Sequence, residues 1–230
     1  MPIRLTTSKE ASLNAGIKAL VYGESGTGKT TLCATAYAPI IISAEGGLLS
    51  VAEKETPTIV VQSEAECNEA LAFILSPAGA NYHTVCLDSI SEIAEKVLTQ
   101  MKAENKDGRA AYGEMNDRMA KIIRSFRDMQ GKHVLFTAKQ EQHTDDVTKI
   151  TKYYPSMPGN KLTVDLPYFF DEVMCLRIGQ NKDGSPLHYM QTVGDMQVIA
   201  KDRSRKLPPT VALPNGEGDT YTQLIVRMMS

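Results

Sequence analysis

The chain has 230 residues, a formal net charge of −2 and 42% hydrophobic residues, which is ordinary for a folded globular protein. The near-neutral balance excludes a globally basic nucleic-acid binder, and no apolar run reaches the length of a membrane span. The first nine residues lack the apolar core of a signal peptide. We therefore expect a cytoplasmic α/β protein without a membrane partner.

Apolar strand patterns alternate with helical patterns over most of the chain, which predicts parallel strands joined by right-handed crossovers. The last three strands follow one another at short intervals, so we expect them to form an antiparallel extension. The segment Glu141–Pro167 is polar and interrupted by proline, and we expect a long functional loop there. The predicted strands are Ile17–Tyr22, Pro39–Ser43, Thr58–Val61, Thr84–Leu87, His133–Thr137, Glu172–Ile178, His188–Thr192 and Met196–Ile199. The predicted helices are Lys29–Ala36, Ala65–Leu75, Ile90–Glu104 and Tyr112–Met129.

A glycine-rich loop joins the first predicted strand to the first predicted helix. The segment from Gly23 to Thr30, GESGTGKT, matches the phosphate-loop pattern G-x-x-x-x-G-K-[ST] at every fixed position. Glycines allow successive backbone N–H groups to curl around a phosphate. The pattern predicts that Lys29 reaches the β- and γ-phosphates and that the Thr30 hydroxyl holds Mg²⁺. We therefore expect ATP and Mg²⁺ as cofactors.

Two acidic residues follow neighbouring strand patterns. Asp88 ends an apolar strand, where an aspartate can hold the Mg²⁺ shell through water. Glu45 follows Pro39–Ser43 and, if that strand lies beside the phosphate-loop strand, would activate the attacking water. Alternatively, Glu45 only begins a turn. The predicted metal ligands are Thr30 and Asp88, and the predicted nucleotide-binding residues are Gly23, Glu24, Ser25, Gly26, Thr27, Gly28, Lys29, Thr30, Thr31 and Asp88.

Two further polar groups are candidates for contact with phosphate. Lys139 or Gln140, after the strand His133–Thr137, can sense the γ-phosphate by hydrogen bonding, or form a solvated strand end. The basic run Lys201–Lys206 can supply charge-assisted donors, or form a solvated turn.

The order of these motifs resembles the RecA-like recombinase core. That family places a catalytic glutamate in an Ala-Glu pair after the second core strand, as in Ala44-Glu45, and ends its second nucleotide motif in Asp-Ser, as in Asp88-Ser89. Its γ-phosphate-sensing glutamine is matched by Gln140. Related ATPases carry a Lys-x-Arg pair that reaches the neighbouring subunit's nucleotide, matched by Lys201-Asp-Arg203. The catalytic residues implied by the resemblance are Glu45, Lys29, Gln140, Lys201 and Arg203.

The chain looks most like the core-only RecA-like ATP-binding proteins of bacteriophages, some of which are single-strand annealing recombinases. The similar stretches are Ser43–Leu48 and Ala200–Arg205. The resemblance implies one RecA-like P-loop NTPase domain over 1–230, with a core at about 15–207 and a tail at 208–230. It implies a mostly parallel central sheet flanked by helices, with an antiparallel C-terminal extension. It also implies a homo-oligomer with nucleotide at the subunit interface, acting in the host cytoplasm with a phage single-strand-binding protein.

In RecA-like cores a loop after the sensing strand faces single-stranded DNA, and Gln142–Asp165 holds that place here. Lysines can follow the phosphates and tyrosines can stack on unpaired bases. Alternatively, this is a surface loop whose two tyrosines pack inward near Pro155. The DNA-binding candidates are Lys149, Lys152, Tyr153, Tyr154 and Lys161.

Three functions fit these patterns. The first is a DNA-stimulated, Mg²⁺-dependent ATPase that promotes annealing or strand pairing in phage recombination. The second is an ATP-dependent loader or accessory ATPase for a replication or recombination partner, in which ATP shifts conformation. The third is a P-loop small-molecule kinase, which needs an acceptor pocket and an arginine-bearing lid.

Overall fold

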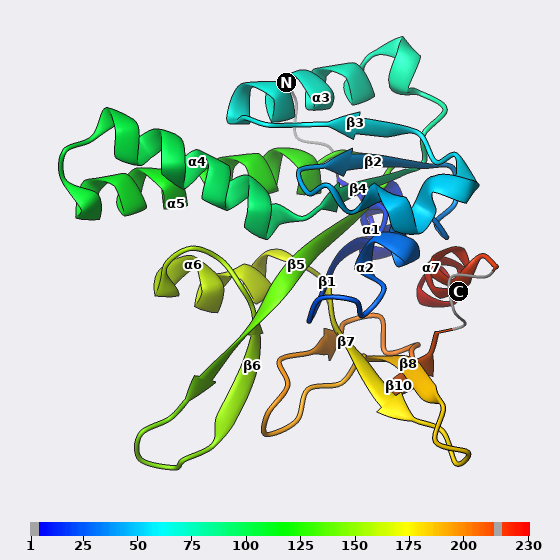
Figure 1. Cartoon of the computed structure of the whole chain (residues 1–230). Coiled ribbons are helices and arrows are strands. Elements are labelled where there is room, and N and C mark those ends of the chain that lie inside the picture. The colour runs from blue at the N-terminus through cyan, green and yellow to red at the C-terminus, as the bar shows by residue number, and fades with distance from the viewer. Residues whose placement is uncertain (1–4, 214–217) are drawn as a thin grey trace.

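A ten-stranded sheet forms the centre of the computed structural model, which describes residues 5–213 and 218–230 (Figure 1). Six strands pair in parallel, and the rest add antiparallel pairs. This confirms the α/β class, the mostly parallel sheet and the antiparallel extension. The strands are β1 (Lys18–Gly23), β2 (Pro39–Ser43), β3 (Thr58–Val60), β4 (Thr84–Asp88), β5 (His133–Thr144), β6 (Thr151–Pro155), β7 (Glu172–Gln180), β8 (Pro186–Gln191), β9 (Lys201–Asp202) and β10 (Thr210–Ala212). Their order is β10-β8-β7-β1-β5-β4-β2-β3, with β6 on β5 and β9 on β7.

Helices cover both faces of the sheet. The α-helices are α1 (Ser8–Ala15), α2 (Lys29–Cys33), α3 (Glu64–Leu75), α4 (Ile90–Glu104), α5 (Gly108–Arg127), α6 (Asn160–Asp165) and α7 (Thr220–Met229), and the 3₁₀ turns are η1 (Gly47–Lys54), η2 (Pro77–Gly79) and η3 (Leu166–Phe169). Leu20 and Tyr22 of β1 pack with α3, α4 and α5, whereas Ala19 and Val21 pack with α2 and α7. This alternation follows from the two-residue period of a strand. Among the described residues, none of the helices is long and apolar enough to cross a membrane.

The central position of β1 determines where the glycine-rich loop leaves the sheet. Every residue of β1 is buried, because β5 and β7 pair with it on its two sides. Its last residue, Gly23, lies level with Lys139 of β5 and Leu176 of β7. A Cβ at Gly23 would lie 2.7 Å from the Leu176 carbonyl oxygen, so this position has no room for a side chain. The loop therefore begins at the carboxyl edge of the parallel strands.

The segment predicted as a long loop is largely ordered structure. β5 continues to Thr144 and pairs antiparallel with β6, and α6 follows. The hairpin formed by β5 and β6 extends away from the core (Figure 1). Its outer residues are exposed on both faces, so they lack the alternation of apolar and polar residues that marks a half-buried strand. The long-loop prediction was therefore wrong.

Other boundaries also differ from the prediction. β7 is parallel to β1, so it belongs to the parallel core rather than to the antiparallel extension. Met196–Ile199 is not a strand, since Val198 makes only an isolated bridge to Tyr153. The tail contributes β10 and α7, and α1 was not predicted. Residues 1–4 of the N-terminal stretch and 214–217 of the predicted tail lie outside the described residues.

Two tyrosines with fully buried rings give opposite expectations for stability. The Tyr22 hydroxyl lies 3.1 Å from the Tyr153 carbonyl oxygen and 2.9 Å from that of Ile199. The Tyr221 hydroxyl has no partner among the described residues. We predict that Tyr22→Phe lowers the free energy of unfolding by about 1 kcal/mol, whereas Tyr221→Phe raises it by about 1 kcal/mol. Urea unfolding of the two variants measures this, and a loss of stability in both would contradict the prediction for Tyr221.

A buried carboxyl group holds β9 against β7. Glu172 is 1% exposed, lies opposite Asp202 in the strand pair and accepts a hydrogen bond from the Ser204 N–H. Burial, followed by the neighbouring Asp202 carboxylate, raises the pKa of Glu172 from 4.5 to about 8. The folded protein therefore holds a proton here that the unfolded chain releases at lower pH.

This raised pKa predicts the pH dependence of stability. The contribution of protonated Glu172 is fully present below pH 4.5 and is lost as the pH rises towards about 8. Glu172→Gln keeps a neutral group there, so its stability relative to wild type should improve between pH 5 and pH 8. Urea unfolding across this range is the measurement. A difference between the two proteins that does not change with pH would contradict the assignment.

Candidate nucleotide site

The glycine-rich loop depends on backbone angles that glycine adopts easily. Gly26 has φ +79° and Gly28 has φ +97°. A Cβ at either position would point into open space, so the requirement is the positive φ rather than crowding. Gly28 accepts the first hydrogen bond of α2, from the Leu32 N–H. The loop thus turns directly from β1 into α2, as the motif predicts.

Lys29 closes this loop on itself. Its ammonium group donates to the carbonyl oxygens of Gly23 at 2.9 Å and Glu24 at 2.8 Å. Burial lowers the pKa of Lys29, and the carboxylates of Glu45 and Asp88 act in the opposite direction. The charged ammonium of Lys29 therefore has two acids nearby and donates only to neutral carbonyl oxygens. A bound phosphate would replace these carbonyl oxygens with anionic acceptors, which form stronger charge-assisted hydrogen bonds.

Thr30 and Asp88, the two predicted metal ligands, are in direct contact. The Thr30 hydroxyl donates to Asp88 Oδ2 at 2.6 Å, and the Thr137 hydroxyl donates to Asp88 Oδ1 at 2.5 Å. Asp88 is 2% exposed, and this burial raises its pKa, whereas the two hydroxyl donors lower it. A hydroxyl and a carboxylate are hard oxygen ligands, and Mg²⁺ typically takes only one or two of these from the protein beside phosphate and water. The residues present therefore fit Mg²⁺.

Glu45 lies beside Asp88 for a different reason from the one expected. β2 is not adjacent to β1, because β5 and β4 lie between them, so the assumed adjacency was wrong. Instead, β2 pairs with β4 and sets Ser43 level with Asp88. The residues that follow these two strands are therefore close together, and the Ser89 hydroxyl donates to Glu45 Oε1 at 2.5 Å. Glu45 thus reaches the same sheet edge as Lys29 and Thr30.

Lys139 and Gln140 continue β5 at this edge and make different contacts. The Lys139 ammonium pairs with Glu92 of α4 at 2.6 Å. The Gln140 amide donates to Glu24 of the glycine-rich loop at 3.3 Å, and the Cys175 thiol lies 3.5 Å from its amide oxygen. Gln140 is therefore the one of the two whose side chain contacts the loop.

Lys201 and Arg203 lie away from the glycine-rich loop of their own chain. β9 pairs with the start of β7 at Glu172, level with Ala19 of β1. Ala19 precedes Gly23 by four residues, or ~13 Å along a strand. Arg203 is mostly exposed and pairs with Asp171 at 2.9 Å. The structure therefore places this pair at the opposite edge of the parallel strands.

The DNA-binding candidates lie on or near the β5–β6 hairpin. Lys149 and Lys152 are exposed, and Lys161 is exposed on α6. Tyr153 is partly buried and has the Arg177 guanidinium 5.2 Å from its ring centroid, whereas Tyr154 meets His143 edge-on at 5.5 Å. The Tyr153 side chain packs against the hydrophobic core, so this tyrosine is the one that packs inward.

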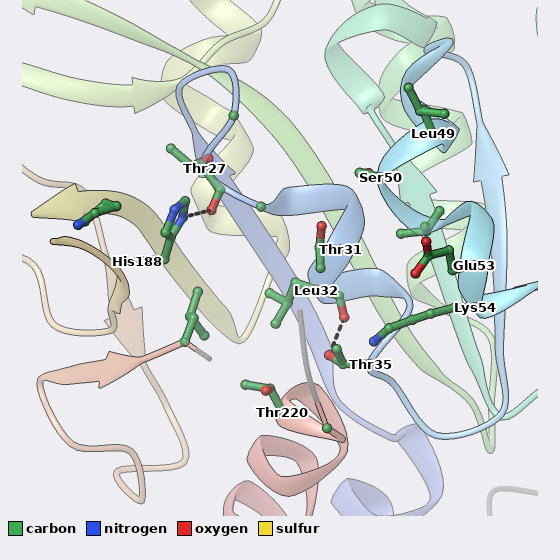
Figure 2. Close-up of a pocket in the computed structure, with 16 residues that line it drawn as sticks. Thr27, Thr31, Leu32, Thr35, Leu49, Ser50, Glu53, Lys54, His188 and Thr220 are labelled. Atoms are coloured by element: carbon green, nitrogen blue, oxygen red, sulfur yellow. Dashed lines mark hydrogen bonds between the residues drawn. The ribbon is translucent and has the colours of Figure 1, made fainter. Parts of the chain in front are cut away.

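A pocket of about 920 Å³ opens beside the glycine-rich loop (Figure 2). It is lined by Thr31 of α2 and Thr35 just after that helix, by Glu53 and Lys54 of η1, by Thr220 of α7 and by His188 of β8. The His188 ring lies against the loop, with Nδ1 3.3 Å from the Thr27 carbonyl oxygen. The sequence predicts only the loop side of this pocket, because its other walls come from distant segments that carry no motif.

Comparison with known proteins identifies a family for this chain. A model of the AAA domain family matches residues 15–204. No curated protein matches the sequence. Among solved structures, the flagellar accessory protein FlaH from Methanocaldococcus jannaschii aligns with a TM-score of 0.47 and 9% identity, over 89% of this chain and 87% of that chain. Because the family model spans most of the chain and contains the glycine-rich loop, the chain belongs to the AAA domain family of P-loop NTPases.

Proposed function

We propose that this protein is a Mg²⁺-dependent ATPase that couples nucleotide turnover to single-stranded DNA in phage recombination. The observation that supports hydrolysis most strongly is the contact between Thr30 and Asp88, with Glu45 beside it at the same sheet edge. These are the groups that phosphoryl transfer to water requires: a metal position, a phosphate cradle and a base. Binding without hydrolysis would not need Glu45 there.

The geometry suggests a path for the nucleotide. The adenosine half would occupy the pocket beside α2, whose volume of about 920 Å³ suits a small-molecule ligand. The phosphates would lie over Gly26 and Gly28, and Lys29 would exchange its carbonyl partners for phosphate oxygens. Bound Mg²⁺ would neutralise charge on the phosphates, held by Thr30 and Asp88. Glu45 would then take a proton from the attacking water.

The β5–β6 hairpin supports a role in DNA binding. Gln140 contacts the glycine-rich loop through Glu24, and the same strand continues into the hairpin that carries Lys149 and Lys152. A change in the contacts of the γ-phosphate would therefore alter the position of Gln140 at the base of the hairpin. In the annealing role, lysines would hold the backbone while Tyr154 stacks on a base. A phage single-strand-binding protein in the host cytoplasm is the expected partner.

The position of Lys201 and Arg203 supports assembly into a homo-oligomer. They lie at the sheet edge opposite their own phosphate loop, so they can serve a nucleotide only on a neighbouring copy. A head-to-tail interface would bring one edge to the other. In this arrangement Arg203 would leave Asp171 and stabilise charge on the transferred phosphoryl group.

Removal of the proposed base should slow ATP hydrolysis. Glu45→Gln should lower ATP hydrolysis by about 100-fold or more, because the attacking water loses its proton acceptor. Release of free phosphate, with and without single-stranded DNA, is the measurement. Glu69→Gln, an exposed acid on α3, is the matched control and should hydrolyse ATP like wild type.

Single-stranded DNA should stimulate the wild type, and Lys149→Ala with Lys152→Ala should weaken that stimulation. Lys182→Ala, at the tip of the β7–β8 hairpin, is the control. Hydrolysis that depends on Glu45 but is indifferent to DNA would favour the loader or accessory ATPase. Transfer of phosphate to a small-molecule acceptor, in place of free phosphate release, would favour the kinase.

A site shared between subunits can be tested by mixing two inactive variants. Lys29→Ala lacks a working phosphate loop, and the double variant Lys201→Ala, Arg203→Ala lacks the basic pair, so each alone should be inactive. In an equimolar mixture about a quarter of head-to-tail interfaces would combine an intact loop with an intact pair. The mixture should therefore hydrolyse ATP. A mixture no more active than its two components would contradict a site shared between subunits.

A further inference from the structure

We infer that Ser89 is a positioning residue that holds the Glu45 carboxylate in the orientation needed to activate water. This inference rests on the proposed ATPase function. The Ser89 side chain is fully buried, and its hydroxyl donates to Glu45 Oε1 at 2.5 Å. The hydroxyl has a single proton to donate, and it donates this proton in a hydrogen bond to Glu45 rather than to the solvent.

The serine is itself held in place from its other side. Ser89 caps the N-terminus of α4, where its Oγ accepts a hydrogen bond from the Glu92 N–H at 3.4 Å. Accepting this bond from the backbone leaves the O–H free to point towards Glu45. α4 packs on the sheet through seven buried residues, so its N-terminus, and with it the Ser89 hydroxyl, is held in a fixed position. The orientation of Glu45 is thereby tied to the packed core.

A second serine secures the backbone of Glu45. The Ser43 hydroxyl donates to the Glu45 carbonyl oxygen at 2.6 Å, and the Ala44 N–H donates to the Asp88 carbonyl at 2.9 Å. These bonds fix where the Glu45 side chain begins, and Ser89 fixes where it ends. Without Ser89 the carboxylate would be partly exposed and free to rotate next to Gly46 and Gly47. A catalytic base misplaced by about 1 Å can lose 100-fold in rate.

The chain contains a matched control for the cap. Ser63 begins α3 with the same bond, accepting from the Glu66 N–H at 3.2 Å. In the described residues Ser63 is not bonded to any group of the nucleotide site. Removal of either hydroxyl therefore deletes a helix cap, but only removal of the Ser89 hydroxyl releases Glu45. The two variants separate loss of a cap from loss of orientation.

The test compares kcat and KM for ATP in Ser89→Ala and Ser63→Ala. Ser89→Ala should lower kcat by about 10- to 100-fold while KM and the affinity for ATP stay near wild type, since the hydroxyl acts on the base and not on the bound phosphates. Ser63→Ala should keep the wild-type kcat. Ser89→Thr, which retains a hydroxyl, should recover most of the lost rate.

Ser89→Gly serves as a second deletion if the alanine variant does not fold, because glycine is well tolerated at an N-cap. In a Glu45→Gln background, either deletion should cause no further loss of kcat. Wild-type kcat in Ser89→Ala, with Glu45→Gln inactive, would overturn the role of Ser89 alone. Wild-type turnover in Glu45→Gln would remove the proposed base and the role of Ser89 with it.

Discussion

The register of parallel strands is the constraint on which the site depends. β1 lies between β7 and β5, and β4 lies between β5 and β2, so the ends of these strands meet at one edge. Gly23 lies level with Lys139, and Ser43 lies level with Asp88. A shift of one residue in either pairing would turn the side chains to the opposite face of the sheet. The buried strands therefore hold the loop, the candidate metal ligands and Glu45 together.

The two edges of the sheet have different chemistry. The carboxyl edge gathers Lys29, Thr30, Asp88 and Glu45, each held by hydrogen bonds to its neighbours. The amino edge carries Arg203, paired with Asp171, and a buried carboxyl at Glu172. One chain therefore holds the candidate phosphate loop on one edge and an exposed, ion-paired arginine on the other. Such an arrangement suits repeated head-to-tail contact between copies, which is why we propose a site shared between subunits.

The sequence predicted the parts of the fold that carry strong local signals. β1, β4 and the glycine-rich loop follow from continuous apolar runs and a fixed motif, and Thr30 and Asp88 meet as expected. The β5–β6 ribbon was missed because its exposed residues lack an apolar face, and α7 was missed within the predicted tail. The assumption that β2 lies beside β1, which brought Glu45 to the site, was also wrong, because strand order is a tertiary property that no local pattern encodes. The pocket walls at His188 and Lys54 depend on the same long-range packing.

The central claim is that Thr30 and Asp88 form a metal position beside the phosphates. The most direct test is the affinity for a non-hydrolysable ATP analogue, measured by calorimetry with and without Mg²⁺, in wild type and Asp88→Asn. Mg²⁺ should tighten binding to the wild type by about 10- to 100-fold, and most of this gain should be lost in Asp88→Asn. Equal affinity with and without Mg²⁺ in the wild type, or an unchanged gain in the variant, would contradict the account.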